Sequence, residues 1–355
     1  VLRDALAREE AGVDDAQWMC VGVYLNRWLD GKRSLRPKTV EGYRMDIDRY
    51  LIPQIGPIKL AELRPHHIDA MYSDLTKAAS RPATPSTIRH VHTTLRSALN
   101  SAVRRRLLAW NPALHVELPE EQRPVTTVWT PQQVQAFLSF TAEHRLSALF
   151  QLIASAGLRR GEALGLHWID VDLDGAAFTV RWQLLELSGG PCLGPPKTRS
   201  GARVVAIDDA TVQALRKHRE AQTAEQEAWE NGWTNIGLAF TREDGTPLRP
   251  NYVSRQFASL AAGCSLPVIR LHDLRHTNAS LALAAGVPLK VVSQRLGHSS
   301  TAITSNLYTH VIPAVARDAA NRIGALIAIP SSHVAGPAPS AFLAHEAQSA
   351  PEETP

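Results

Sequence analysis

Cysteine is scarce in this sequence, and the few cysteines that occur are isolated. The 355 residues include only Cys20, Cys192 and Cys264, and none of them belongs to a CxxC pair. An odd number of widely separated cysteines supports neither a disulfide framework nor a zinc knuckle. We therefore expect a reducing compartment, the bacterial cytoplasm, for this chain.

Long apolar runs and internal repeats are also missing. No stretch of about 18 consecutive apolar residues occurs, so we expect no membrane span. The first ten residues, VLRDALAREE, contain no signal-peptide core. Hydrophobic residues nevertheless make up 44% of the chain and charged residues 20%, as in ordinary globular proteins. The length suffices for two domains with separate cores, or for three small ones.

The net charge of +4 conceals an uneven distribution. Between Arg27 and Leu118 there are 16 Lys and Arg but only 8 Asp and Glu, so the remainder of the chain is net negative. Basic side chains that neutralise phosphates release condensed counterions, so a basic segment of this size suits nucleic acid. A solvated basic surface without a partner would give the same charge, and charge alone does not separate these interpretations.

Helical periodicity dominates the N-terminal third. Apolar residues at helical spacing predict helices over residues 15–29, 39–51 and 65–78, and Pro53 and Gly56 should stop the second of them. A fourth helix should follow Thr84-Pro85 and run toward Leu107. One of its flanks and its end carry the basic residues Arg89, Arg96, Arg104, Arg105 and Arg106. This pattern predicts a small helical bundle with a basic surface.

A second set of elements follows a charged, proline-containing segment. Thr130 and Pro131 should cap and begin a helix, and helices should continue to Ala156, where Gly157 breaks the pattern. Strands are expected over 177–185 and 203–207, with a turn-rich stretch between them. The chain is then helical again, and its composition shifts after Pro330 to Ala, Pro, Ser and Glu. The predicted fold class is therefore mainly α with a small antiparallel β-sheet.

Several side chains in this second set suit phosphate chemistry, although each is a weak signal alone. Arg159 and Arg160 stand between two glycines, but adjacent arginines usually form a solvated surface. His272 and Arg275 are three residues apart at a helix start and should share a face. His272 and His276 have the spacing of a metal-binding pair, yet no third ligand is evident. The remaining candidates are Lys197 in the turn-rich stretch, His298 after a Leu-Gly pair, and Tyr308 ten residues further on.

Read together, the order and spacing of these residues resemble the tyrosine recombinase (phage integrase) family. The strings that match are AGLRRGEALGLHW, PPKTRSGARVV, LHDLRHTNAS, RLGHSS and LYTHV. The resemblance covers residues 15 to about 330. It implies a site-specific DNA recombinase that cuts and rejoins DNA through a 3′-phosphotyrosine, with no metal or other cofactor, and that integrates or excises a phage or mobile element.

The resemblance also implies a role for each matched residue. Tyr308 would be the nucleophile, and Arg159 and Arg275 would neutralise charge on the pentavalent phosphate. Lys197 would protonate the departing 5′ oxygen. His272 would help to deprotonate the tyrosine, His298 would position a phosphate oxygen, and Glu162 would brace the arginines. If Arg275 acts only in this way, Arg275→Ala should slow cleavage and leave the fold nearly intact.

The same resemblance suggests the domain organisation. We expect an N-terminal remnant or linker over 1–14, a helical, SAM-like core-binding domain over 15–118 and a linker over 119–127. A mixed α/β catalytic domain should span 128–330, and a disordered tail 331–355.

The expected partners are double-stranded attachment sites and a homotetramer of this chain on DNA, with a monomer when free. Accessory DNA-bending or directionality proteins would fit the same system. An amphipathic stretch over 311–327 either packs within its own subunit or docks into a neighbouring one. Three other interpretations remain open: a Xer-like resolvase, a type IB topoisomerase-like enzyme and a non-catalytic DNA-binding protein.

Overall fold

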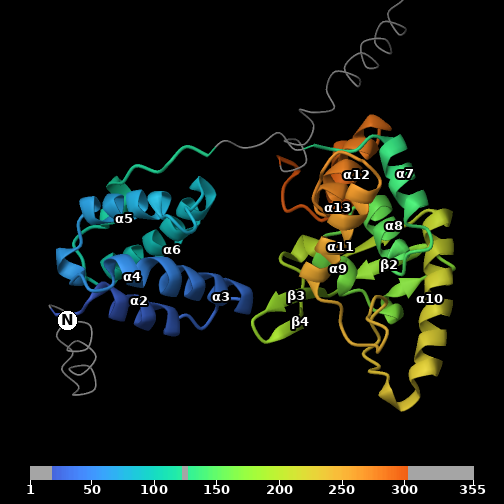
Figure 1. The fold of residues 1–355 in the computed structure, drawn as a ribbon, viewed down its shortest axis with the longest axis horizontal. Helices are drawn as coiled ribbons and strands as arrows, with labels where there is room; N and C mark the ends of the chain where they lie inside the picture. The colour runs from blue at the N-terminus through green and yellow to red at the C-terminus, as the bar shows by residue number, and fades with distance from the viewer. Residues whose placement is uncertain (1–17, 122–126, 303–355) are drawn as a thin grey trace, which may run out of the picture. The chain divides into compact units, whose positions relative to one another are not determined.

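A computed structural model describes residues 18–121 and 127–302, in two parts that each have a hydrophobic core (Figure 1). The N-terminal part is helical. Its elements are α2 (Val21–Asp30), α3 (Pro37–Asp46), a π-helical turn (Ile47–Leu51), α4 (Ile52–Ile55), α5 (Pro65–Lys77) and α6 (Pro85–Arg104), with short 3₁₀ turns at Leu60–Glu62 and Pro112–His115.

The long helix α6 begins directly after Thr84, as the sequence predicts. Thr84 Oγ1 accepts a hydrogen bond from the Thr87 amide and so caps the helix start. The apolar stripe Val91, Leu95 and Leu99 is fully buried against α2 and its neighbours. Burying an aliphatic side chain of this kind stabilises the fold by about 1.5–3 kcal/mol. The predicted four-helix pattern is therefore confirmed in outline.

The predicted helix stop at Pro53 is wrong, whereas the stop at Gly56 is confirmed, because the helix ends at Ile55 with Gly56 as its C-cap residue. The helical path continues from α3 through the π-helical turn and into α4, where Pro53 occupies the first turn. Proline normally removes one backbone hydrogen bond and collides with the carbonyl group four residues earlier. The wider turn over Ile47–Leu51 changes that local bonding pattern just before the proline. The chain can therefore accommodate Pro53 without ending the helix.

The C-terminal part combines helices with two small antiparallel sheets. Its helices are α7 (Pro131–Phe140), α8 (Ser147–Ala156), α9 (Arg160–Leu164), α10 (Asp209–Trp229), α11 (Pro250–Gly263), α12 (Asp273–Ala284) and α13 (Leu289–Leu296). Its strands are β1 (Val171–Asp172), β2 (Ala177–Val180), β3 (Gln183–Leu187), β4 (Gly190–Gly194) and β5 (Arg203–Ala206), with 3₁₀ turns at Trp168–Asp170, Arg199–Gly201 and Glu230–Gly232. The mainly α fold class with a small antiparallel sheet is confirmed.

The strand predicted over 177–185 is two strands that belong to different sheets. β2 pairs with β1 and β5 in a three-stranded sheet, whereas β3 pairs with β4 in a hairpin of its own. The break falls at Arg181 and Trp182, whose side chains are both exposed. Leu184 alone is fully buried in β3, so the apolar pattern continues across the break and hides it in the sequence.

Local signals at helix ends place the elements of the site. Thr130 and Gln133 form a capping box at the start of α7, as Thr-Pro predicts. Gly157 ends α8 and Gly297 ends α13, both in the left-handed conformation that favours glycine. Among the described residues, no helix is long and apolar enough to cross a membrane.

Candidate active site

Two adjacent arginines follow the turn between α8 and α9, and they contact different neighbours. Arg159 is the N-cap residue of α9, and its Nη2 donates to the Gly297 carbonyl oxygen at 3.2 Å. Arg160 instead donates to Ser254 Oγ at 2.6 Å and so joins α9 to α11. Arg159 rather than Arg160 therefore faces the end of α13.

The turn before these arginines is tightly packed. A Cβ at Gly157 would collide with the side chains of Leu296 in α13 and Asn278 in α12, and its φ of +65° already disfavours other residues. Asn278 Nδ2 donates to the Ala154 and Ser155 carbonyl oxygens at 2.9 and 2.8 Å. These contacts hold the end of α8, and with it Arg159, against α12 and α13.

Three arginine side chains converge on the end of α13. We call the carbonyl groups of residues 295–297 the α13 cap. Arg203 Nε donates to the carbonyl oxygen of residue 295 and Arg275 Nη2 to that of residue 296, each at 2.6 Å. Arg159 Nη2 donates to the carbonyl oxygen of residue 297 at 3.2 Å. The last carbonyl groups of a helix lack partners within it and carry partial negative charge, so cations suit them. His298 follows the cap directly.

Arg275 is the most deeply buried of these cations, with 2% of its surface exposed. Besides the α13 cap, it donates from Nη1 to the Gly157 carbonyl oxygen at 2.7 Å. Burial, and then repulsion by Arg159, lower the pKa of Arg275 to about 9. It stays cationic near pH 7. A buried cation beside a second cation has a strong electrostatic preference for an anion, such as a phosphate.

Glu162 is the carboxylate that offsets part of this charge. Its Oε1 accepts from Arg159 Nη1 at 2.5 Å and its Oε2 from Arg203 Nη2 at 3.0 Å, while its side chain is only 2% exposed. Burial by itself would raise the pKa of Glu162, but Arg203 and then Arg159 outweigh it, so the pKa lies below its ordinary value. The predicted bracing of Arg159 by Glu162 is present in this geometry.

Two predicted histidines lie beside the three arginines at the α13 cap, which we call the arginine cluster. Burial, followed by the charges of Arg275 and Arg159, lowers the pKa of His298 to about 4. Desolvation by neighbouring groups, then His276 and Arg275, lower the pKa of His272 to about 4, although the residue itself is exposed at the surface. The rings of His272 and His276 meet edge to face with 5.0 Å between their centroids. Both site histidines are therefore neutral near pH 7.

Known protein families match this chain over most of its length. The family described as "Phage integrase family" matches residues 127–314, which is more than half of the chain. The chain belongs to the phage integrase family. It is a site-specific tyrosine recombinase, an enzyme that breaks and rejoins DNA strands. A second model, "Phage integrase, N-terminal SAM-like domain", matches residues 21–76.

Curated relatives carry the same family names. A tyrosine recombinase XerC-like protein of Caldanaerobacter subterraneus subsp. tengcongensis is 28% identical over 320 residues, which is 84% of this chain and 81% of the relative. An integrase of Saccharopolyspora erythraea is 25% identical over 356 aligned positions, covering 84% of this chain and 80% of that protein.

Solved structures show that the recombinase fold is shared. The Tn1549 transposon integrase in complex with a circular intermediate DNA has a TM-score of 0.72 at 20% identity, over 86% of this chain and 99% of that one. A lambda integrase dimer bound to a COC′ core site has a TM-score of 0.60 at 18% identity, over 84% of this chain and 80% of that one.

Lys197 of the recombinase lies in an exposed loop between β4 and β5. The sequence places it on the turn of a hairpin formed by 177–185 and 203–207. In the structure the tight turn is instead at Ser188-Gly189, and Lys197 follows the returning strand β4. Among the described residues, no hydrogen bond or ion pair joins Lys197 to the arginine cluster. Its predicted role as general acid stays a prediction.

Tyr308, the predicted nucleophile, lies outside the described residues, as do the segments 1–14, 311–327 and 331–355. His298 is the last of the predicted catalytic residues that the structure describes. The structure thus brings together Arg159, His272, Arg275 and His298, with Glu162 beneath the arginines. The predicted domain bounds likewise stay predictions.

Arg203 is the residue that the sequence interpretation missed. It contacts both Glu162 and the α13 cap, and only 8% of its side chain is exposed. A signal was available, because residues alternate between the faces of a strand and Val205 and Ile207 are apolar. This alternation places Arg203 on the buried face of β5, where a charged residue needs partners.

The five arginines predicted to bind DNA differ in their surroundings. Arg96 and the run Arg104 to Arg106 are exposed on and after α6. Arg89 is part-buried instead, and its Nη2 donates to the Pro119 carbonyl oxygen at 2.9 Å. Arg89 therefore holds the segment after α6 against the helical bundle. This contact occupies one of the donor groups of Arg89.

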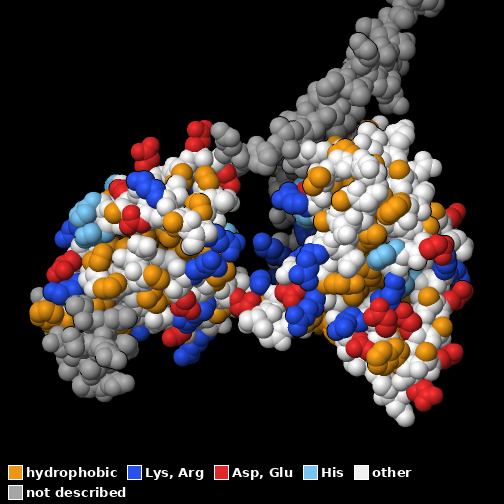
Figure 2. Space-filling view, in the orientation of Figure 1, with side chains coloured by type: hydrophobic (Ala, Val, Ile, Leu, Met, Phe, Trp, Pro, Cys, Tyr) orange, Lys and Arg blue, Asp and Glu red, His pale blue; other side chains and the backbone are white. Residues whose placement is uncertain are grey.

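Basic side chains also gather on the C-terminal part of the recombinase. Figure 2 shows Lys and Arg on the side that carries β3, α9 and α11, whereas acidic side chains are more frequent toward α10. The helix α9 begins at Arg160, directly after its N-cap residue Arg159. A positive surface next to the arginine cluster suits a phosphate backbone.

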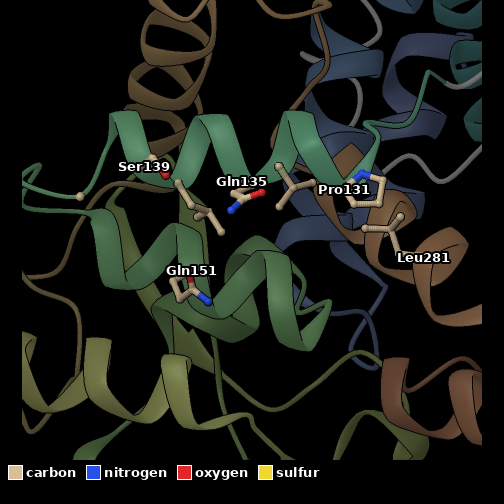
Figure 3. Close-up of a pocket in the computed structure, with 8 residues that line it drawn as sticks. Pro131, Gln135, Ser139, Gln151 and Leu281 are labelled. Carbon is tan, nitrogen blue, oxygen red and sulfur yellow. The ribbon is translucent and has the colours of Figure 1, made fainter. Parts of the chain in front are cut away.

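A groove between α7 and α8 is chemically different from this cluster (Figure 3). Its volume is about 550 Å³, and its lining is Pro131, Val134, Gln135, Leu138, Ser139, Ala142, Gln151 and Leu281. No charged side chain lines it, so it does not suit a phosphate. Among the described residues, no group of three His, Cys, Asp or Glu is arranged to hold a metal ion.

Proposed function

We propose that Tyr308 is the nucleophile of this recombinase, with Arg159, Lys197, His272, Arg275 and His298 as its catalytic partners. The observation that carries the proposal is the convergence of Arg159 and Arg275 on the α13 cap, directly before His298. Guanidinium groups can each donate two parallel hydrogen bonds to phosphate oxygens. Fixed cations of this kind stabilise the charge that develops on a pentavalent phosphate.

The proposed cleavage step forms one bond and breaks another at the scissile phosphorus. The phenol oxygen of Tyr308 bonds to the scissile phosphorus, and the bond from phosphorus to the 5′ oxygen breaks. Neutral His272 accepts the phenol proton, and the Lys197 ammonium gives a proton to the departing 5′ oxygen. The resulting 3′-phosphotyrosine conserves one phosphoester bond. Rejoining reverses these transfers and needs no nucleotide.

The basic surfaces supply the rest of the DNA contact in this proposal. Arg96 and the run Arg104 to Arg106 would contact phosphates and set the position of the duplex, whereas base-edge contacts would set sequence. Arg89 would contribute less, because its side chain already holds the segment after α6.

We propose integration and excision of a mobile genetic element as the biological reaction. Relatives that support this are named an integrase of Mycobacterium phage D29, 25% identical over 311 residues, and an ICEBs1 integrase of Bacillus subtilis, 26% identical over 248 residues. Attachment sites on a phage or mobile element and on its host would be the substrates. Accessory bending or directionality proteins would select between the two directions.

A Xer-like resolvase is the second candidate, because the XerC-like relative is 28% identical over 84% of this chain. A resolvase recombines two copies of one site, whereas an integrase joins two different sites that share a short core. One plasmid with two copies of the same site and another with two different sites that share a core separate these functions. A plasmid with a single site tests for topoisomerase-like relaxation, which needs no second site.

We further propose that four protomers assemble on two duplexes and that a free protomer is monomeric. The amphipathic stretch 311–327 would link neighbouring protomers. Deletion of residues 312–330 should then abolish recombination and leave binding to one site intact. Recombination that survives this deletion would contradict the role of the stretch.

The proposed nucleophile can be tested on DNA of random sequence. The full chain is incubated with a pool of nicked duplexes whose sequences are randomised, washed under denaturing conditions, and the covalently attached DNA is sequenced. We expect a defined sequence from the wild type and no covalent DNA from Tyr308→Phe, which should still retain duplexes under native conditions. Adducts at normal yield in Tyr308→Phe would remove Tyr308 from this role.

A further inference from the structure

Arg203 contacts three separate elements through three different nitrogen atoms. Nε donates to the α13 cap at 2.6 Å, Nη1 to the Gly201 carbonyl oxygen at 2.9 Å, and Nη2 to Glu162 at 3.0 Å. These acceptors belong to α13, to the loop between β4 and β5, and to α9. One side chain therefore joins the predicted general-acid loop to the predicted phosphate-binding cluster.

The loop that carries Lys197 is fixed at both of its ends. At its start, Gln183 Nε2 donates to the Pro195 carbonyl oxygen at 2.7 Å. At its end, Gly201 is buried so closely against Pro196 that a Cβ there would lie 2.6 Å from the proline side chain. Arg203 binds the Gly201 carbonyl group and so holds this end. Lys197 itself is exposed between these anchors.

The same loop approaches the site from the other side as well. A Cβ at Gly297 would lie 2.7 Å from Arg203 Nη1 and 2.8 Å from the Ser200 carbonyl oxygen. The loop backbone thus packs directly on the residue before His298. Arg203 and the loop end therefore support each other, and loss of Arg203 would remove one of the contacts that hold the loop.

We propose that Arg203 is a positioning residue that sets the place of Lys197 relative to the arginine cluster during DNA cleavage. This inference rests on the proposed roles of Lys197 and Tyr308. Arg203 need not touch DNA to act in this way. It fixes the end of the loop to Glu162 and to the α13 cap, so that the Lys197 ammonium meets the departing 5′ oxygen. A general acid acts only within hydrogen-bond reach of that oxygen.

A purely structural role for Arg203 would give a different chemical signature. If Arg203 only stabilised the fold, its loss would slow cleavage of every substrate alike. If it positions the general acid, its loss should matter only where the leaving group needs a proton. A duplex with sulfur in place of the scissile 5′ bridging oxygen provides this contrast, because a thiolate leaves without being protonated.

The experiment compares single-turnover formation of the covalent adduct on two versions of the duplex recovered from the random pool. One version has the natural phosphate and the other a 5′ bridging phosphorothiolate. We expect Arg203→Lys to cleave the natural duplex about 100-fold more slowly than the wild type and the phosphorothiolate within about fivefold of it. Lys197→Ala should show the same pattern, whereas Arg275→Lys should be slow on both.

Two further variants complete the comparison. Arg216→Gln removes an exposed arginine of α10 that pairs with Asp174, so it controls for the lost positive charge and should cleave both duplexes normally. Arg203→Gln should cleave the natural duplex more slowly than Arg203→Lys does. Its cleavage of the phosphorothiolate duplex should again be close to that of the wild type. If Arg203→Gln does not fold, as judged by thermal melting, Arg203→Lys decides, because its ammonium keeps a cation opposite Glu162.

The outcomes separate this inference from the proposed function. No adduct from the wild type on any duplex would refute the proposed function itself. A wild type that cleaves, together with Arg203→Lys that is equally slow on both duplexes, would show that Arg203 acts through Arg159 or the fold. A normal rate for Arg203→Lys on the natural duplex would also overturn the inference.

Discussion

The Arg275 guanidinium donates to the Leu296 carbonyl oxygen at 2.6 Å, at the end of the helix that leads to His298. Its other η nitrogen donates to the Gly157 carbonyl oxygen at 2.7 Å, at the end of α8. One buried side chain therefore ties together the two helix ends beside which Arg159 and His298 lie. In the proposed mechanism, the same guanidinium group also supplies positive charge for catalysis.

Arg275→Lys should separate these two roles in part. Lysine keeps the positive charge, but one ammonium cannot reproduce the fixed geometry of two guanidinium nitrogens. We expect adduct formation to slow by about 100- to 1000-fold, with duplex binding near that of the wild type. Quenched single-turnover assays and native gel shifts measure the two quantities. A wild-type cleavage rate would exclude Arg275 from charge stabilisation.

Arg275→Ala should do more than slow cleavage, contrary to the expectation from sequence. It leaves the Leu296 and Gly157 carbonyl groups without their arginine donor in a buried setting, and each unsatisfied group costs about 1–3 kcal/mol. A lower free energy of unfolding in urea is therefore expected for Arg275→Ala. The sequence could not show this second role, because both acceptors are backbone atoms from distant segments.

Features with local causes were predicted well from the sequence. Thr130 caps α7 and Gly157 ends α8, because each depends on side chains or φ angles within a few residues. The approach of Arg159 to Arg275 followed only from the resemblance to a family, since no local pattern brings these residues together. The ordered motifs carried that information.

Features that depend on distant contacts were missed. The break between β2 and β3 depends on which strands pair, and the apolar alternation alone does not reveal it. In the sequence, Arg203 is one charged residue among several near Lys197. Its partners lie on α9, on the loop before β5 and at the end of α13, so its role requires the tertiary fold.

Glu162→Gln should destabilise the recombinase at neutral pH. Removal of the carboxylate leaves Arg159, Arg203 and Arg275 close together without their counter-ion, and loss of one partner of a buried ion pair costs about 3–5 kcal/mol. Urea unfolding at pH 7 measures the loss. The exposed Glu220→Gln on α10 is the matched control and should unfold like the wild type.

The pH dependence of this loss has a definite sign. The pKa of Glu162 in the native protein lies below the ordinary value of 4.5. The ionised carboxylate therefore adds to the free energy of unfolding above pH 4.5, and this stabilisation disappears as the pH falls through the native pKa. The difference between wild type and Glu162→Gln should therefore be constant from pH 7 to about pH 5 and shrink in stronger acid. A difference that grows in acid would contradict the assigned contacts.

His298→Asn should weaken the acid sensitivity of the fold. The pKa of His298 is about 4 in the native protein and 6.5 ordinarily, so the unfolded chain binds more protons between these values. Wild-type stability should therefore fall as the pH drops from 6.5 toward 4. At pH 5 this histidine should lower the free energy of unfolding of the wild type by about 1 kcal/mol, allowing for its partial exposure. Urea midpoints of both proteins at pH 7 and pH 5 test the difference, and equal pH dependence would contradict it.

Gly297→Ala should damage both the fold and catalysis, and Gly286→Ala provides its matched control. Both glycines follow a helix and have positive φ, +67° and +81° respectively. A Cβ at Gly286 meets nothing within 4 Å, so alanine there should cost only about 1 kcal/mol for the left-handed backbone.

At Gly297 the same methyl group would press on the Ser200 carbonyl oxygen and on Arg203. We therefore expect Gly297→Ala to lose stability beyond the control by about 1–3 kcal/mol, as in other overpacked sites. It should also form the covalent adduct about 100-fold more slowly, because the loop that carries Lys197 and the ring of His298 both shift. Urea unfolding and single-turnover cleavage of the two variants give these differences. Equal values for Gly297→Ala and Gly286→Ala would show that the contact between the loop and the α13 cap does not matter for cleavage.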